Sequence, residues 1–225
     1  FLLAQVNIRA GKLDDAIKAA EDALAGRDKL RPNQVPQVMD FLGTAYLQQN
    51  PPNVTRAAAM YDELLKIQPG NFRALNNMAY LKMMPQSGAA PVDALAYSQR
   101  AFDEMMNANL YEAEIADTHG WVLIEAGRVD QGIVVLREAV GRRPTLVEGW
   151  YHLALGHYKK GELRDADDAL RRAEELMDSN RRKGLTLDPV IESKIKEMRV
   201  QMPPSTSALP PPDAPLSDPN GPGGR

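Results

Sequence analysis

Residues 117–150 read DTHGWVLIEAGRVDQGIVVLREAVGRRPTLVEGW, and residues 151–176 continue as YHLALGHYKKGELRDADDALRRAEEL. The second segment repeats the first at a distance of 34 residues, so that Gly120 corresponds to Ala154 and Gly127 to Gly161. A fixed period of this length is typical of helical repeat arrays, with small residues where two helices meet and a glycine where the chain turns. This stretch therefore predicts an all-α solenoid.

The same pattern extends from this stretch over most of the chain. On the second helix of each predicted unit, two small or apolar residues lie seven positions apart, close to two helical turns, and therefore face the same neighbour. These pairs are Ala16 and Ala23, Ala57 and Leu64, Ala94 and Ala101, Gly132 and Ala139, and Ala166 and Ala173. The first helices carry one small residue each: Ala4, Gly43, Ala79, Gly120 and Ala154. Only the turns vary in length, and we place the long ones, residues 50–53 and 85–91, on the outside edge.

The pattern divides the chain into an array and a tail. We predict units at about residues 1–30, 35–70, 71–108, 112–146 and 147–180. Asp188 followed by Pro189 is typical of a helix N-terminus, and we expect a capping helix over residues 188–202 that closes the 1–202 array. Residues 203–225 contain eight prolines and few large apolar side chains, which predicts a disordered tail.

Composition limits the classes of function. The formal net charge is -3, so the chain has no general electrostatic attraction for nucleic acid or anionic membranes. It contains no cysteine, which excludes disulfides and zinc-finger spacing but fits both the cytoplasm and the periplasm. The chain begins at Phe1 inside a unit, and we expect a piece of a longer protein whose missing N-terminal part would hold any targeting signal.

Two segments carry a recognisable family pattern. Residues 150–157 contain Trp150-x-x-Leu153-Ala154-x-x-His157, and residues 39–46 contain Met39-x-x-Leu42-Gly43-x-x-Tyr46, while Ala57, Tyr61 and Pro69 follow on the second helix. The chain resembles the tetratricopeptide repeat family, in particular its long bacterial arrays. The resemblance implies a right-handed α-solenoid of about five helix pairs plus a C-terminal capping helix. His119, Gly132 and His157 depart from the usual Leu, Ala and Tyr.

In the family that the chain resembles, the first helices line a concave groove that binds peptides or helices. Residues three, four and seven apart on these helices point into the groove. The predicted partner-binding residues are Asp40, Thr44, Arg73, Asn76, Tyr80, Met83, Asp117, Trp121, Ile124, Tyr151, Leu155 and Tyr158. We expect Trp150 to pack in the core instead. The Lys, Asn and Arg clamp by which chaperone-tail-binding members hold a carboxylate is missing, which favours a neutral, apolar or basic protein or peptide segment as the partner.

Enzyme functions find little support. The three histidines do not form a metal-binding or catalytic set, because only Glu148 and His152 have helical ligand spacing, and we predict no catalytic residue, metal or cofactor. Several acidic residues on the predicted inner surface argue against nucleic acid. We therefore predict a non-catalytic protein-interaction scaffold. The alternative is an assembly or spacer module that acts through its outer surface in a bacterial envelope or secretion system.

Overall fold

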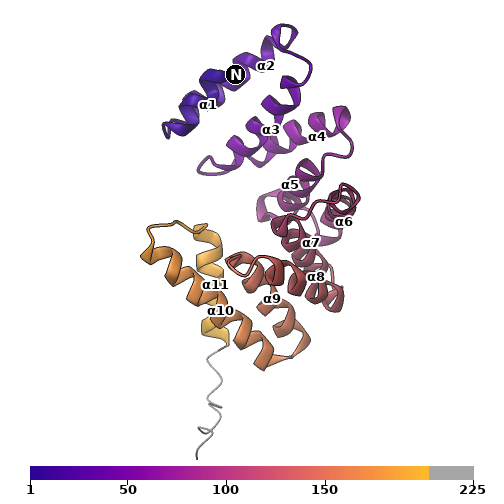
Figure 1. The fold of residues 1–225 in the computed structure, drawn as a ribbon, viewed down its shortest axis with the longest axis vertical. Helices are drawn as coiled ribbons and strands as arrows, with labels where there is room; N and C mark the ends of the chain where they lie inside the picture. Colours follow the sequence, from indigo (N-terminus) through magenta and orange to yellow (C-terminus); the bar gives the residue numbers. More distant parts are fainter. Residues whose placement is uncertain (203–225) are drawn as a thin grey trace, which may run out of the picture.

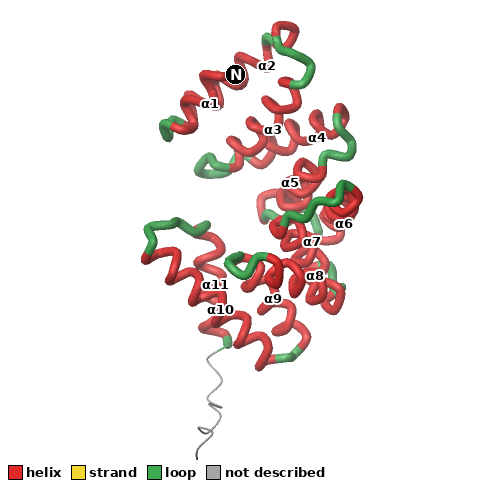
Figure 2. The backbone as a smooth tube through the Cα atoms, in the orientation of Figure 1, coloured by secondary structure: helices red, strands yellow, loops and turns green. Residues whose placement is uncertain are grey.

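The computed structural model describes residues 1–202. Within this range the chain forms eleven α-helices and two short 3-10 helices (Figures 1 and 2). The α-helices are α1 (Leu2–Arg9), α2 (Leu13–Ala25), α3 (Gln34–Leu47), α4 (Val54–Ile67), α5 (Phe72–Met83), α6 (Pro91–Asn107), α7 (Ala113–Glu125), α8 (Val129–Arg142), α9 (Val147–Lys160), α10 (Leu163–Arg182) and α11 (Pro189–Gln201). The 3-10 helices are η1 (Arg27–Lys29) and η2 (Pro85–Ser87).

Ten of these described helices form five pairs, each packed on the next. The pairs follow one another along a curved path, from α1 and α2 in indigo to α9 and α10 in orange (Figure 1). No strand occurs among residues 1–202, and the predicted solenoid of five helix pairs with a C-terminal helix is confirmed. None of the described helices is long and apolar enough to span a membrane. The predicted disordered tail, residues 203–225, lies outside the described residues.

Local sequence explains where the helices begin and end. The side chains of Asn53 and Asn71 accept hydrogen bonds from the backbone N–H groups three residues later and so cap α4 and α5. The turns inside the fourth and fifth pairs contain Gly127 and Gly161, whose φ angles are +83° and +82°. Glycine adopts this left-handed conformation without steric cost, so a connection of three residues in the fourth pair and two in the fifth can reverse the chain there.

The two helices of a pair meet at the predicted small residues. A Cβ atom built on Gly43 of α3 would lie 2.5 Å from Cζ of Tyr61 on α4. One on Gly120 of α7 would lie 2.6 Å from Cγ of Leu136 on α8. Tyr61 and Leu136 are both fully buried, and each follows the first small residue of its second helix by four positions. In the second and fourth pairs a glycine on one helix is therefore matched by a large side chain on the other, whereas the remaining pairs have alanine at this position.

His119 occupies a position where the family usually has leucine. It is 3% exposed, its Nδ1 lies 3.1 Å from Oγ of Ser98, and its ring stacks on Phe102 at 5.1 Å between centroids. Burial lowers its pKa to about 4, so the ring is neutral at pH 7. The small, polar Ser98 on α6 leaves both the space and the partner that a histidine on α7 needs.

Trp150 is less buried than we expect from the sequence. It packs only partly against the core formed by α7 to α11, and its indole Nε1 donates a hydrogen bond to the Pro144 carbonyl at 2.9 Å. An indole N–H needs a hydrogen-bond acceptor, and here the preceding turn supplies it at the surface. The predicted core packing of Trp150 is therefore confirmed only in part, because the side chain lies at the edge of the core.

Candidate functional site

The concave side of the array contains a pocket with a volume of about 580 Å³. Its walls come from the first helices α5, α7 and α9, from two turns that precede second helices, from the connection between α8 and α9, and from the start of α11. The lining residues are Pro52, Tyr80, Met83, Met84, Pro85, Gln86, Glu114, Asp117, Thr118, Trp121, Arg143, Leu146, Glu148, His152, Asp188, Val190, Ile191 and Lys194. We call this the groove pocket. Its surface combines thioether, proline and aromatic groups with carboxylates at the edges.

Three rings from three successive units form one side of the groove pocket. The ring of Tyr80 on α5 lies 6.2 Å from that of Trp121 on α7, measured between centroids. Trp121 in turn stacks on His152 of α9 at 5.0 Å with an interplanar angle of 7°. Asp117 fixes the position of His152, because His152 Nδ1 lies 2.8 Å from Oδ1 of this buried carboxylate. Aromatic surface fixed in this way can receive an apolar ligand with little loss of conformational entropy.

The charges around the groove pocket are mainly negative. Burial raises the pKa of the Tyr80 hydroxyl, and the nearby carboxylates of Asp188 and Glu148 raise it further. Glu114 forms an ion pair with Arg143, whereas Glu148 forms none with the other described residues. The ammonium group of Lys194 on α11 lies 5.4 Å from the centroid of Trp121. A cation at the ring face is therefore already part of this site.

The structure brings four of the predicted partner-binding residues together. Tyr80, Met83, Asp117 and Trp121 all line the groove pocket. Asp117, however, is 6% exposed and bonded to His152, so its role there is to position the histidine.

The predicted residues on α9 lie along the neighbouring surface. Tyr151 is 7% exposed and Leu155 is partly buried, and both contact the core that α11 joins. Tyr158 lies further along α9 and is 37% exposed. The side chains of Tyr151 and Leu155 are therefore covered by the chain itself.

The predicted residues on α3 and the start of α5 lie outside the groove pocket. Arg73 makes a bidentate ion pair with Glu112, and the hydroxyl of Thr44 lies 3.1 Å from that of Tyr61. Burial raises the pKa of Asp40, partly offset by the charge of Arg73. The buried Oδ1 of Asn76 has no hydrogen-bond partner within residues 1–202.

Ile124 is a correction to the predicted set. Its side chain is 1% exposed and belongs to the core, so no partner can contact it in this structure. Cβ atoms built on Gly132 and Gly156 would lie 2.6 and 2.7 Å from Cγ1 and Cδ1 of Ile124, respectively. The two glycines on α8 and α9 thus form the space that the isoleucine fills, which helical spacing on α7 alone does not reveal.

Sequence reasoning missed the residues that the turns and α11 contribute. Pro52, Pro85 and Gln86 belong to the two long turns, which we place on the outside edge from the sequence, but they border the groove pocket. Their extra length was the available signal, because an insertion at the end of a first helix can fold over the concave side. Asp188 and Lys194 carried no such signal, since the direction of α11 depends on distant contacts.

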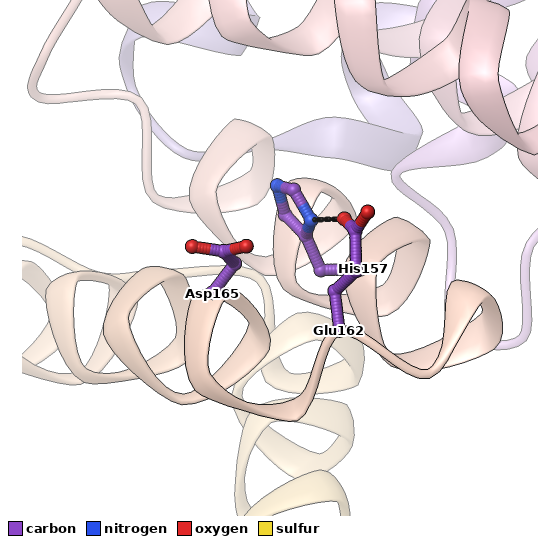
Figure 3. Close-up of side chains that lie close together, drawn as sticks. All are labelled: His157, Glu162 and Asp165. Atoms are coloured by element: carbon purple, nitrogen blue, oxygen red, sulfur yellow. Dashed lines mark hydrogen bonds and ion pairs between the residues drawn. The ribbon is translucent and has the colours of Figure 1, made fainter.

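A second polar cluster lies at the turn between α9 and α10. His157, Glu162 and Asp165 approach one another there (Figure 3). The buried His157 has its Nδ1 2.6 Å from Glu162 Oε2 and its Nε2 3.5 Å from Arg137 Nη2. Lys160 Nζ lies 2.7 Å from the other oxygen of Glu162. A divalent cation would displace these contacts and lie beside two positive charges, so the geometry favours a structural role at the turn.

Comparisons with known proteins agree with the repeat fold. Residues 1–72 match the family model described as tetratricopeptide repeat. No curated protein matches the chain in sequence.

Several solved structures share the fold. MamA from Desulfovibrio magneticus RS-1 has 20% sequence identity and a TM-score of 0.61, over 78% of this chain and 92% of MamA. PilW, described as a type IV pilus biogenesis factor, has 16% identity and a TM-score of 0.64, over 89% of each chain. YrrB, described as having an unusual peptide-binding site, has 16% identity and a TM-score of 0.57, over 86% of this chain and 88% of YrrB.

Proposed function

Because the chain carries tetratricopeptide repeats, whose arrays serve as protein-interaction scaffolds, we propose that it is a non-catalytic scaffold that holds a partner segment in the groove pocket. The observation that supports this most directly is the row of Tyr80, Trp121 and His152, three rings from three successive units beside Met83. Tyr80 and Trp121 are at least partly exposed, whereas His152 is buried and supports Trp121. Exposed aromatic side chains in a concave site are typical of binding hot spots.

The lining of the groove pocket indicates the chemistry of the segment. Apolar side chains of the partner would contact Tyr80, Met83 and Trp121. Glu148 is a carboxylate without an ion pair among the described residues, and a lysine or arginine of the partner would complement it. An acidic segment would instead meet Glu114, Glu148 and Asp188. We therefore propose an apolar segment with at least one basic residue.

The proposal is tested by removing the rings. In the intact protein, Tyr80→Ala combined with Trp121→Ala should abolish capture of the partner while the melting temperature changes little, because both side chains are partly exposed. Val134→Ala, which truncates a residue on α8 that is 67% exposed, is the matched control and should leave capture unchanged. Affinity capture followed by mass spectrometry measures partner capture by both variants, and thermal unfolding measures their melting temperatures. Undiminished capture by the double variant would contradict the proposal.

The alternative is an assembly or spacer role through the outer surface. The structural likeness to PilW, described as a pilus biogenesis factor, is the observation that favours it, and at 16% identity this likeness concerns the fold. Val134 and Leu163, two exposed apolar residues on second helices, are the positions to test. Loss of assembly on changing these residues to Asp, with partner capture intact, would support the alternative.

A further inference from the structure

α11 does not continue the register of the repeat. It begins 42 residues after α9, at Pro189 against Val147, which is eight more than the period. α10 runs on to Arg182, through the position where a sixth unit would start. α11 also lacks the glycine or alanine by which every first helix in the array approaches its neighbour. It is therefore an added helix, held by contacts of its own.

The C-terminal half of α11 is firmly docked. Ile195, Met198 and Met202 are at most 6% exposed and join the same core as Tyr151 of α9. Arg199 donates two hydrogen bonds to the carboxylate of Glu174, at 2.9 and 2.7 Å, and a third to Asp167 at 2.6 Å. Hydrogen bonds from Arg199 and Arg171 hold the pKa of Asp167 below its usual value although its burial acts in the opposite direction. Arg199 thus clamps α11 to α10.

The N-terminal half of α11 has no fully buried side chain but is tied to α10 by the ion pair of Arg181 and Glu192 at 2.8 Å, and it forms a wall of the groove pocket. Val190 is 58% exposed, and neither it nor Ile191 is buried. Lys194 contacts the groove through the face of Trp121, at 5.4 Å from its centroid. α11 packs on α10, and its apolar residues Ile191, Ile195, Met198 and Met202, at intervals of four, three and four residues, join the core that contains Tyr151 and Leu155 of α9. Its N-terminal half also borders the groove pocket beside α7 and α9.

We propose that α11 is an intrachain occupant of the concave groove, and that the partner segment is an amphipathic helix of the same pattern that takes its place. This inference rests on the proposed function of the groove pocket. The partner helix presents apolar residues at intervals of four, three and four to Tyr151 and Leu155, and a lysine to the face of Trp121. Exchange is feasible because the incoming helix buries apolar surface similar to that which α11 gives up.

The clamp at Arg199 sets the balance of this exchange. A ligand that competes with an internal occupant binds with an affinity reduced by the fraction of molecules whose site is free. Substitutions that undock α11 should therefore increase affinity. Arg199→Ala removes the clamp and leaves Asp167 paired with Arg171, and Ile195→Ser removes the most buried apolar contact independently.

The probe is a fluorescein-labelled peptide of residues 186–202, added to the full chain and followed by fluorescence anisotropy. We expect Arg199→Ala and Ile195→Ser chains to bind it at least about tenfold more tightly than the unaltered chain. Lys196→Ala, a change on the exposed side of the same helix, is the control and should bind like the unaltered chain. A peptide that carries Lys194→Glu should bind both undocked variants with an affinity at least about threefold lower.

Equal affinity for all four chains, or no binding to either undocked variant, would overturn the exchange. The two proposals fail separately. If partner capture depends on Tyr80 and Trp121 while the peptide does not bind, the groove function stands and the helix exchange is wrong. If the peptide binds the undocked variants but capture ignores Tyr80 and Trp121, the pocket is not the site of partner binding.

Discussion

At the contact between α2 and α3, the hydroxyl of Tyr46 donates a hydrogen bond to Glu21 Oε1 at 2.7 Å. At the corresponding contact between α8 and α9, His157 Nε2 lies 3.5 Å from Nη2 of Arg137. Tyr46 and His157 each follow the small residue of a first helix by three positions, and Glu21 and Arg137 each follow that of a second helix by five. The repeat thus keeps a polar pair at this place, but the residue types change from tyrosine and glutamate to histidine and arginine.

The apolar contacts also differ between the N-terminal core, formed by α1 to α5, and the C-terminal core, formed by α7 to α11. In the N-terminal core, Tyr61 fills the space over Gly43 and also bonds Asn77 and Thr44. In the C-terminal core, Leu136 covers Gly120, and Gly132 brings two backbones together. The contact in the N-terminal core depends on an aromatic ring with polar partners, whereas the contact in the C-terminal core depends on two glycines that let the helices approach closely.

The largest expected effect comes from filling the glycine contact of the C-terminal core. A Cβ on Gly132 would lie 2.6 Å from the carbonyl oxygen of Gly120, a backbone atom that cannot move without shifting α7. We expect Gly132→Ala to destabilise the protein by about 3 kcal/mol, although alanine is the better helix former.

The control for this prediction lies on the same helix. Gly141 has no atom within 4 Å of its would-be Cβ, so Gly141→Ala should stabilise by about 0.5 to 1 kcal/mol. Denaturant unfolding of both variants measures the difference. A stabilised Gly132→Ala would mean that α7 and α8 do not approach as closely as described.

These glycines mark the limit of what the sequence predicts. The repeat pattern places all five small residues of the first helices, although only Gly120 and Ala154 are 34 residues apart, because small residues mark the contact between helices directly. It does not tell that Gly132, where the family usually has alanine, must be glycine, since this depends on the distance between two backbones. The burial of Ile124 has the same cause, because Gly132 and Gly156 create its space from other helices.

The candidate site was predicted only in part for a similar reason. Tyr80, Met83, Asp117 and Trp121 lie on regular first helices, where spacing determines direction, and they line the groove pocket. The contributions of Pro85, Lys194 and Asp188 depend on how a long turn and an out-of-register helix fold back over the groove. Periodicity carries no information about such elements.

The next effect concerns the boundary between the two cores, where His119 of α7 meets Ser98 of α6. Its pKa in the folded protein is about 4, below the ordinary value of 6.5, so the neutral ring is favoured by folding. The corresponding stability is complete above pH 6.5 and is lost as the pH falls towards 4, by about 2 kcal/mol at pH 5. Urea unfolding at pH 7 and pH 5 should show this loss in the unaltered chain.

His119→Leu, which introduces the residue usual at this position in tetratricopeptide repeats, removes the titrating group. Ser98 keeps its hydrogen bond to the Leu95 carbonyl at 3.2 Å in that variant. The difference in stability between pH 7 and pH 5 should therefore shrink. An unchanged difference would assign the acid sensitivity to other groups.

A smaller effect is expected in the N-terminal core. Tyr61→Phe keeps the ring over Gly43 but removes the oxygen that accepts a hydrogen bond from Asn77 at 3.0 Å. We expect a loss of about 1.5 kcal/mol, because the Asn77 amide loses its partner. Thermal unfolding, with Tyr158→Phe on the exposed part of α9 as the control, measures the loss. If the two variants have the same melting temperature, the polar contacts of Tyr61 do not contribute to stability.

The smallest effect is expected at Trp150, whose register position is that of Met39 in the N-terminal core. Met39 is 1% exposed, whereas Trp150 is partly buried and bonded through Nε1 to Pro144. Trp150→Phe keeps most of the apolar contact and removes one solvent-accessible hydrogen bond, so we expect a loss below about 1 kcal/mol. A loss as large as that of Gly132→Ala would make Trp150 a core residue like Met39.

The Trp150→Phe variant also leaves Trp121 as the sole tryptophan, since the chain has two. Its emission then reports on Lys194 and α11 directly, and a change in that emission when the α11 peptide binds would connect the difference between the two cores to the exchange at the groove.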